Sequence, residues 1–252
     1  MTNIGIDIGS TYTKYCVLSD DGVILRLWSE RTPVRQKEYF ADKLMNLRAN
    51  YSACRVVSCG YGKRNIESLK SVTELSALSV GLDKVCPDIP VALDIGGQDT
   101  KIIRQKDGKL REFFVNDKCA AGSGLFFASV LNILDTRFEK VALDSAYGAD
   151  EINLSNLCAV FAQSEIVELL AFGTEPAAII QAAVRQILTQ AFALLNKIDE
   201  SGTLVLSGGL SQIRGFEPFA AKVLNRAVCI PENAPYLAAL GCAVIAWKGQ
   251  TL

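Results

Sequence analysis

The chain carries an internal repeat, and this repeat constrains its fold more than any other feature of the sequence. Residues 7–14 read Asp-Ile-Gly-Ser-Thr-Tyr-Thr-Lys, and residues 94–101 read Asp-Ile-Gly-Gly-Gln-Asp-Thr-Lys. Five of the eight positions are identical, at a separation of 87 residues. Each copy follows a short apolar run and precedes a second strand-like run, an Asp-Gly turn and a third strand-like run. The repeat therefore predicts two related halves.

Strand and helix patterns continue along both halves. Strands are expected at 4–6, 15–18, 23–28, 56–59, 91–93, 102–103, 110–115, 203–206 and 227–230. Helices are expected at 37–50, 72–85, 124–134, 160–172, 176–198 and 237–247. Strands and helices in duplicated units predict an α/β fold. We expect a first domain at 1–88 and a second at 89–236, with a closing helix at about 237–252 as a candidate to pack back on the first.

The composition excludes several kinds of chemistry. The 252 residues include 26 Lys and Arg, 27 Asp and Glu, eight cysteines and no histidine. The net charge of −1 gives no electrostatic reason to expect a nucleic-acid or membrane-surface partner. We find no leader pattern and no long uninterrupted apolar stretch, so we expect a cytoplasmic protein. Without histidine, metal or redox chemistry must use cysteines, carboxylates or the backbone.

The repeated motif has the chemistry of a phosphate-binding turn. Glycine lets the backbone approach a phosphate, turn amides donate to its oxygens, and Ser10 and Thr11 add hydroxyl donors. Asp7 and Asp94 at the strand ends can hold Mg²⁺ through water. One such motif is equally consistent with an ordinary hairpin. Two copies, followed by Ser-Gly-Gly at 207–209 after a third strand, favour nucleotide binding.

This order of motifs resembles the actin, sugar kinase and Hsp70-type ATPase superfamily. In that superfamily the two Asp-x-Gly motifs are the phosphate loops, and Ser-Gly-Gly belongs to the adenosine site. The resemblance covers most of the chain. It implies an α/β, actin-like (ribonuclease H-like) ATPase fold in which two related α/β subdomains surround a nucleotide cleft.

Cys119 and Cys158 each precede an expected helix N-terminus. The unpaired amides and the dipole there stabilise a thiolate or an anionic cluster bound to it. Two thiolates cannot fill a four-cysteine iron–sulfur site, but a twofold dimer supplies four. On spacing alone, the better reading is that both cysteines are small buried hydrophobes.

The local sequences around these cysteines favour the cluster. Lys-Cys-Ala-Ala-Gly-Ser-Gly at 118–124 and Cys-Ala-Val-Phe-Ala-Gln-Ser-Glu at 158–165 resemble the two cluster-ligand motifs of 2-hydroxyacyl-CoA dehydratase activators. These proteins form part of the BadF/BadG/BcrA/BcrD ATPase family. Further matches are Gly-Tyr-Gly-Lys at 60–63, Asp-Ile-Gly-Gly-Gln-Asp at 94–99, Ser-Gly-Gly at 207–209 and Ala-Leu-Gly-Cys-Ala at 239–243.

The resemblance implies an ATPase coupled to low-potential electron transfer. Such a protein holds one [4Fe–4S] cluster between the two chains of a homodimer, binds ATP or ADP with Mg²⁺, and gives one electron to a partner iron–sulfur enzyme. A 2-hydroxyacyl-CoA dehydratase is the expected acceptor, and ferredoxin or flavodoxin the expected reductant.

The resemblance also assigns roles to individual residues. Cys119 and Cys158 are the implied cluster ligands, and Asp7, Asp94 and Gln98 the implied catalytic residues. The implied nucleotide-binding residues are Gly9, Ser10, Thr11, Lys14, Gly96, Gly97, Gly208 and Gly209. We include Asp99, Lys101, Gly122 and Gly124 in this binding set, although Asp99 and Lys101 are equally candidates to hold the loop itself.

Three other functions remain open. One is a small-molecule kinase of the same superfamily with Asp94 or Asp99 as its base, and another is a non-redox chaperone-like or regulatory module. The third is an activator of a benzoyl-CoA reductase-like or double-cubane-cluster enzyme. It stays open because Leu78 stands where relatives often carry histidine. We expect the remaining cysteines to be core residues: Cys16, Cys54, Cys59, Cys86, Cys229 and Cys242.

Overall fold

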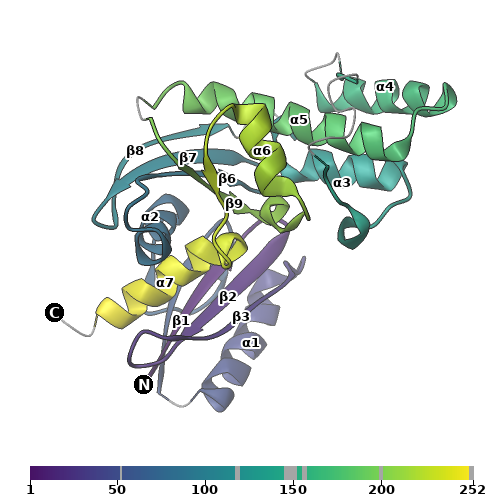
Figure 1. The fold of residues 1–252 in the computed structure, drawn as a ribbon. Coiled ribbons are helices and arrows are strands. Elements are labelled where there is room, and N and C mark those ends of the chain that lie inside the picture. Colours follow the sequence, from purple (N-terminus) through teal and green to yellow (C-terminus); the bar gives the residue numbers. More distant parts are fainter. Residues whose placement is uncertain (52, 117–119, 145–151, 155–157, 199–200, 250–252) are drawn as a thin grey trace. The chain divides into compact units, whose positions relative to one another are not determined.

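The computed structural model describes residues 1–51, 53–116, 120–144, 152–154, 158–198 and 201–249 (Figure 1). They form two compact units. The first unit comprises residues 1–90, 103–112 and 236–252, and the second comprises residues 91–102 and 113–235. The described strands form two five-stranded sheets.

The first sheet has the strand order β3-β2-β1-β4-β5. Strand β1 pairs antiparallel with β2 and parallel with β4. Because alternate residues of a strand point to opposite faces, Ile4, Ile6 and Ile8 of β1 share one face and pack in one cluster with residues of α1. The elements are β1 (Thr2–Ile8), β2 (Tyr12–Leu18), β3 (Ile24–Arg31), α1 (Gln36–Asn50), β4 (Cys54–Cys59), η1 (Lys63–Asn65) and β5 (Lys70–Ser71).

Glycines bring the backbones close together on the other face of this sheet. Helices α2 (Glu74–Val85) and α7 (Leu237–Lys248) lie there, and α7 packs against both α2 and β1. A Cβ at Gly5 of β1 would lie 1.9 Å from the Ala239 carbonyl oxygen of α7. A Cβ at Gly241 of α7 would lie 1.8 Å from the Ala77 carbonyl oxygen of α2. No side chain fits at either contact, which explains glycine there.

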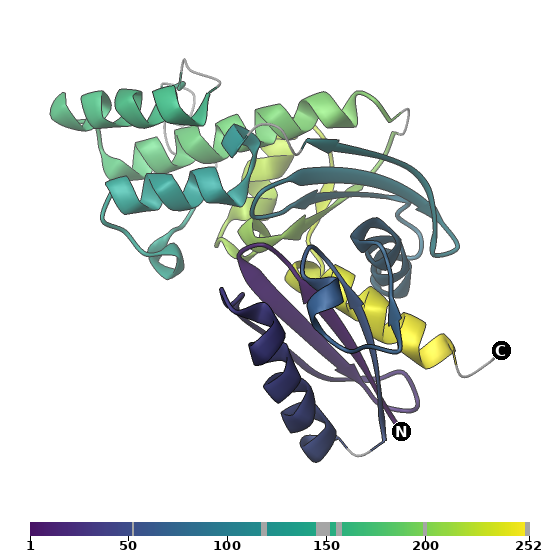
Figure 2. The same ribbon diagram turned by 180° about the vertical axis from the view of Figure 1, so that it is seen from behind.

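The second sheet has the strand order β10-β9-β6-β7-β8, and β9 pairs parallel with both β6 and β10. Figures 1 and 2 show helices α3, α4 and α5 side by side. The strands are β6 (Val91–Ile95), β7 (Thr100–Lys106), β8 (Lys109–Asn116), β9 (Leu204–Gly208) and β10 (Val228–Cys229). The helices are η2 (Ala120–Gly122), α3 (Gly124–Ile133), η3 (Phe138–Lys140), α4 (Ala159–Ala171), α5 (Pro176–Leu195), η4 (Gly209–Gln212), α6 (Phe216–Leu224) and η5 (Ala234–Tyr236).

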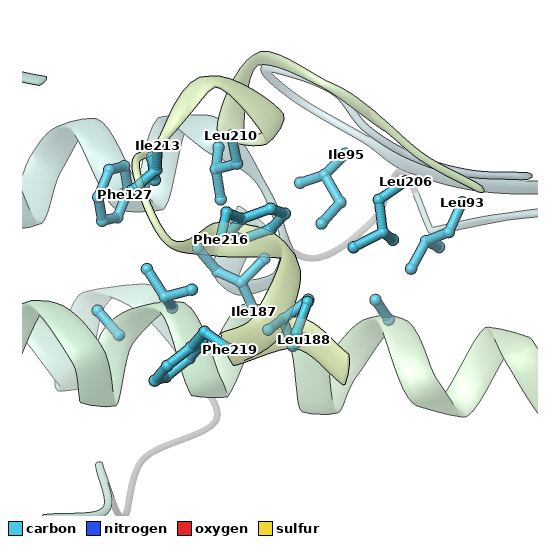
Figure 3. Packing of buried hydrophobic residues seen from close by; sticks show 14 of the residues in the cluster. Leu93, Ile95, Phe127, Ile187, Leu188, Leu206, Leu210, Ile213, Phe216 and Phe219 are labelled. Atoms are coloured by element: carbon cyan, nitrogen blue, oxygen red, sulfur yellow. The ribbon is translucent and has the colours of Figure 1, made fainter. Parts of the chain in front are cut away.

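The core of the second unit lies between its strands and α5. Phe216 and Phe219 of α6 lie beside Ile187 of α5, and Leu206 of β9 belongs to the same cluster (Figure 3). Each fully buried side chain of this size contributes about 1.5–3 kcal/mol. Helix α5 is the one described helix long and apolar enough to cross a membrane, and 67% of its most apolar window is buried. That burial is typical of a core helix.

The repeat in the sequence corresponds to a repeat in structure. β1-β2-β3 and β6-β7-β8 are each three consecutive strands that neighbour one another in a sheet. Gly22 and Gly108 close the second turn of each copy, with φ of +74° and +68°, a conformation that favours glycine.

Several element boundaries differ from the sequence expectation. Helix α2 begins at Glu74 because Thr73 caps it, its Oγ1 accepting the Ser76 N–H at 3.1 Å. Helix α5 ends at Leu195, and α6 and β5 were not expected. In α6, Pro218 obscured the helical pattern, although it lies in the first turn, where proline is tolerated.

Candidate functional site

The first phosphate-loop candidate begins at Asp7, near the carboxyl end of β1. Strand pairing places Asp7 opposite Lys14 of β2 and Cys59 of β4. The Lys14 Nζ lies 3.8 Å from Asp7 Oδ2, and the Cys59 thiol donates to Asp7 Oδ1 at 3.6 Å. A hydrogen bond to Cys242 and then burial raise the pKa of the Cys59 thiol, so Cys59 remains a neutral donor to the carboxylate. No motif in the sequence points to Cys59 as a partner of Asp7.

The turn after Asp7 is closed by its own backbone and anchored by Thr32. The Gly9 N–H donates to the Tyr12 carbonyl oxygen at 3.2 Å. The Thr32 hydroxyl donates to the Gly9 carbonyl at 2.8 Å, and the Thr32 N–H donates to the Thr11 carbonyl at 2.9 Å. Ser10 is exposed within this anchored turn. Thr32 follows β3 and belongs to no recognisable motif, so its contact with the turn could not be predicted from the sequence.

The second phosphate-loop candidate repeats this geometry. Asp94 lies near the end of β6, and Lys101 Nζ is 3.8 Å from Asp94 Oδ2, the same distance as in the first loop. The Gly96 N–H donates to the Asp99 carbonyl at 2.8 Å and closes the turn. Ser207 of β9 donates to Asp94 Oδ1 at 2.7 Å. Gln98 is exposed at the tip of the loop.

The two lysines differ in their surroundings. Lys101 also lies 2.6 Å from Asp99 Oδ1, and only 6% of its side chain is exposed. Lys14 retains 20% exposure. A buried ammonium between two carboxylates holds the second loop together, whereas Lys14 is better placed to meet a ligand from solvent. The structure therefore distinguishes two residues that the repeated motif presents as equivalent.

The Ser-Gly-Gly segment uses its two glycines differently. Gly208 pairs with Ile95 across the sheet, and a Cβ there would lie 2.1 Å from the Ile95 carbonyl oxygen. At Gly209 no heavy atom lies within 4 Å of the Cβ position. Gly208 is thus required by strand packing, whereas Gly209, the first residue of η4, leaves open space beside its backbone.

A cavity of about 430 Å³ lies in the first unit beside the first loop. Gly9 and Ser10 line it together with Gln36 and Lys37 at the start of α1 and Asn65 of η1. The Asn65 side-chain amide donates to Gln36 Oε1 at 2.6 Å. The lining combines polar groups and the Lys37 cation with the side chains of Val34 and Tyr61, and no carboxylate is among the lining residues.

The two cysteine motifs are described only in part. Cys119 lies outside the described residues, but Gly124, five residues later, donates its N–H to the Gly96 carbonyl at 2.9 Å. Gly122 lies beside Gln190 of α5. Cys158 is an exposed thiol at the N-cap of α4.

The exposure of Cys158 contradicts the reading of this residue as a small buried hydrophobe. The position of Cys158 is compatible with a cluster ligand, because a helix N-terminus stabilises a thiolate and an anionic cluster bound to it. Of the six other cysteines expected in the core, Cys16, Cys59 and Cys242 are buried, while Cys54, Cys86 and Cys229 are only partly so.

Residues 4–246 match the BadF/BadG/BcrA/BcrD ATPase family. The (R)-2-hydroxyglutaryl-CoA dehydratase activating ATPase of Acidaminococcus fermentans is 31% identical over 254 residues, which is 97% of this chain and 96% of that protein.

Two solved structures resemble the chain over its whole length. The activator of the 2-hydroxyisocaproyl-CoA dehydratase from Clostridium difficile, with bound ADPNP, has a TM-score of 0.90 at 27% identity, covering 100% of this chain and 96% of that one. Component A of the Acidaminococcus fermentans (R)-2-hydroxyglutaryl-CoA dehydratase has a TM-score of 0.86 at 28% identity, covering 100% of both chains. The expected actin-like ATPase fold is confirmed.

Proposed function

This chain belongs to the BadF/BadG/BcrA/BcrD ATPase family, and on that premise we propose that it is an ATP-driven one-electron donor to a partner iron–sulfur enzyme. Family membership supports the ATPase activity. The observation that carries the proposal is the pair of matching Asp–Lys loops at strand ends, in a chain that also presents the thiol of Cys158 at a helix N-terminus.

The two loops would bind the polyphosphate and its metal. Asp7 and Asp94 would hold hydrated Mg²⁺, because Mg²⁺ prefers carboxylate and water oxygens. Gln98 would orient the attacking water at the exposed tip of the second loop. The remaining proposed nucleotide contacts are Gly9, Ser10, Thr11, Lys14, Gly96, Gly97, Gly208 and Gly209. We assign Asp99 and Lys101 to holding the second loop, because they bind each other.

Cys119 and Cys158 would bind a [4Fe–4S] cluster shared with a second copy of the chain. When bound, the cluster supplies a one-electron carrier. Two thiols per chain require a twofold dimer, and the surface beside Cys158 is suited to one, since Val160 and Phe161 are 68% and 63% exposed. An apolar surface next to the proposed ligand supports burial of that surface in a homodimer.

The proposed acceptor is a 2-hydroxyacyl-CoA dehydratase or a similar double-cluster enzyme. Similar chains are named as activators of such dehydratases, and a more distant relative is named as one of the chains of a benzoyl-CoA reductase. Ferredoxin or flavodoxin would supply the electron in the cytoplasm. Leu78 is 1% exposed on α2, so the residue that replaces the usual histidine does not itself form a docking surface.

A small-molecule kinase is the alternative from another class. It would need a carboxylate base near the acceptor hydroxyl. Asp94 and Asp99 are the candidates, but each already contacts Lys101. The described residues of the cavity beside the first loop offer no further carboxylate.

Iron content separates these functions. Anaerobically purified protein should contain about two iron and two acid-labile sulfide per chain, which is one cluster per dimer. Cys119→Ala and Cys158→Ala should each lose the iron, while Cys229→Ala, at a partly buried cysteine outside both motifs, should keep it. Wild-type protein without iron that phosphorylates a sugar would establish the kinase instead.

A further inference from the structure

The second phosphate loop is hydrogen-bonded directly to the segment that follows Cys119. The Gly124 N–H donates to the Gly96 carbonyl at 2.9 Å, and the Leu125 N–H donates to the Gly97 carbonyl at 2.8 Å. In addition, the Thr100 hydroxyl donates to the Gly122 carbonyl. These three bonds, which we call the Thr100 bridge, connect residues 96–100 to residues 122–125. All of these residues lie in the second unit.

The hydrogen bonds and close backbone packing of the Thr100 bridge hold residues 96–100 against residues 122–125. Thr100 is 1% exposed and Gly122 is buried, so breaking the bond between them leaves a buried carbonyl without its donor. Gly96, Gly97 and Gly124 are half-buried, and Leu125 is exposed. A Cβ at Gly124 would lie 3.1 Å from the Gly96 carbonyl oxygen, which shows that backbone packs on backbone. A displacement of the phosphate loop must therefore move the start of α3 or break these three hydrogen bonds, of which the one between Thr100 and Gly122 is buried.

On the far side of the bridge, the chain leads to Cys119. Gly122 is only three residues from Cys119, and three residues of chain span at most about 10 Å. Gly122 is also held from its other side, because a Cβ there would lie 3.3 Å from Gln190 Cβ of α5. A displacement of the phosphate loop would therefore reach Cys119 through the bridge and the short stretch of chain between Gly122 and Cys119.

We infer that Thr100 is a positioning residue that transmits nucleotide occupancy from the second phosphate loop to Cys119. This inference rests on the proposed function, since it assumes that the loop binds the nucleotide phosphates. A phosphate bound at Gly97 and Gln98 shifts the loop, the Thr100 bridge carries the shift to residues 122–125, and the Cys119 thiol changes its surroundings. Two sites are then coupled through a contiguous set of hydrogen bonds.

The test uses cluster-free protein, so that its result does not depend on whether a cluster binds. Alkylation rates of Cys119 and Cys158 are followed by peptide mass spectrometry, with and without Mg²⁺ and a non-hydrolysable ATP analogue. In wild type, the nucleotide should change the Cys119 rate at least about fivefold, a usual size for coupling between sites. Cys158, outside the bridge, supplies the reference rate.

Two variants isolate the hydroxyl. Thr100→Val keeps the shape but leaves the Gly122 carbonyl without its donor, and Thr100→Ser keeps the donor. Thr100→Val should bind the analogue yet show less than about a twofold change at Cys119, while Thr100→Ser should respond like wild type. A full response in nucleotide-bound Thr100→Val would overturn the inference.

A measurement on wild type keeps the inference testable if Thr100→Val does not fold. Hydrogen exchange at the Gly124 and Leu125 amides should slow at least about fivefold when the analogue binds. Unchanged exchange in nucleotide-saturated protein would contradict the bridge. That result would leave the proposed function standing, because iron content and ATP turnover test it separately.

Discussion

At the scale of single residues, the two Asp–Lys pairs share a distance but differ in burial. Lys101 is enclosed by Asp94 and Asp99, whereas Lys14 is paired with the buried Asp7 alone and is itself the more exposed of the two lysines. Removing either lysine leaves buried carboxylate charge without its counter-ion, on two carboxylates in the second loop and on Asp7 alone in the first. The same motif therefore predicts different consequences in its two copies.

Lys101→Met should lower the free energy of unfolding by about 3 kcal/mol, because two buried carboxylates lose their counter-ion. Lys14→Met should lower it by less, about 1–2 kcal/mol, because only one buried carboxylate, Asp7, loses a partner and Lys14 itself is partly exposed, and it should also weaken nucleotide binding. Urea unfolding and nucleotide titration of both variants measure the contrast. Equal losses of stability would show that the two pairs are energetically alike.

The buried thiols should be inert compared with Cys158. The thiolate is the reactive form of cysteine. A hydrogen bond to Cys242 and then burial raise the pKa of Cys59, and burial raises the pKa of Cys16 to about 12. In folded, cluster-free protein at pH 8, iodoacetamide should modify Cys158 at least about 100-fold faster than Cys59. Comparable rates before unfolding would refute this ordering.

At the scale of elements, α1 is joined to β3 through Glu30. Lys43, Tyr39 and Trp28 all donate to the Glu30 carboxylate. The Lys43 ammonium also lies 5.1 Å from the centroid of the Tyr15 ring, within range of a cation–π interaction. One carboxylate thus connects a helix to the sheet on which it packs.

The Glu30 network should make stability depend on pH. Burial opposes ionisation, but hydrogen bonds from Lys43 and Tyr39 lower the pKa of Glu30 overall. A lowered pKa in the folded state stabilises the fold above the unfolded pKa of about 4.3, and this contribution disappears as pH falls. Urea midpoints at pH 6 should therefore be lower in Glu30→Gln than in wild type, and the gap should shrink by pH 3. A constant gap would contradict the network.

The α2–α7 crossing depends on glycine. Gly241→Ala places a methyl group 1.8 Å from the Ala77 carbonyl oxygen, so the helices must separate, at a cost of about 2–3 kcal/mol. Gly249→Ala is a matched control at the end of α7, where the nearest atom is 3.3 Å away. Thermal unfolding should show a clear loss for the first variant and almost none for the second. Equal melting temperatures would mean that the crossing adapts.

At the scale of the whole molecule, the sequence predicted what is encoded locally. The Asp-Ile-Gly repeat predicted two copies of a three-strand unit, because turn glycines and apolar runs act over a few residues. Thr32, Cys59 and Ser207 could not be predicted as partners of the loops. They lie 23 to 113 residues away along the chain and meet the motifs only through the fold.

The candidate site was predictable to the same extent. The motifs predicted roles for Asp7, Asp94 and Cys158, and these roles stay predictions. The motifs did not predict that Lys101 is enclosed by two carboxylates, because a one-dimensional repeat carries no information about burial. The link between Thr100 and Gly122 spans 22 residues and depends on how α3 begins. The expectation of electron transfer comes from the family resemblance alone and stays a proposal.

The central claim is that ATP hydrolysis drives the transfer of one electron from this protein to a partner iron–sulfur enzyme. The direct test reduces the anaerobic protein, adds a 2-hydroxyacyl-CoA dehydratase, and follows ATP turnover and the electron paramagnetic resonance signal of the reduced cluster together. The signal should disappear only when ATP is present and hydrolysed, and the dehydratase should become active in step. Loss of the signal at the same rate without ATP, or ATP turnover that leaves the signal unchanged, would contradict the claim.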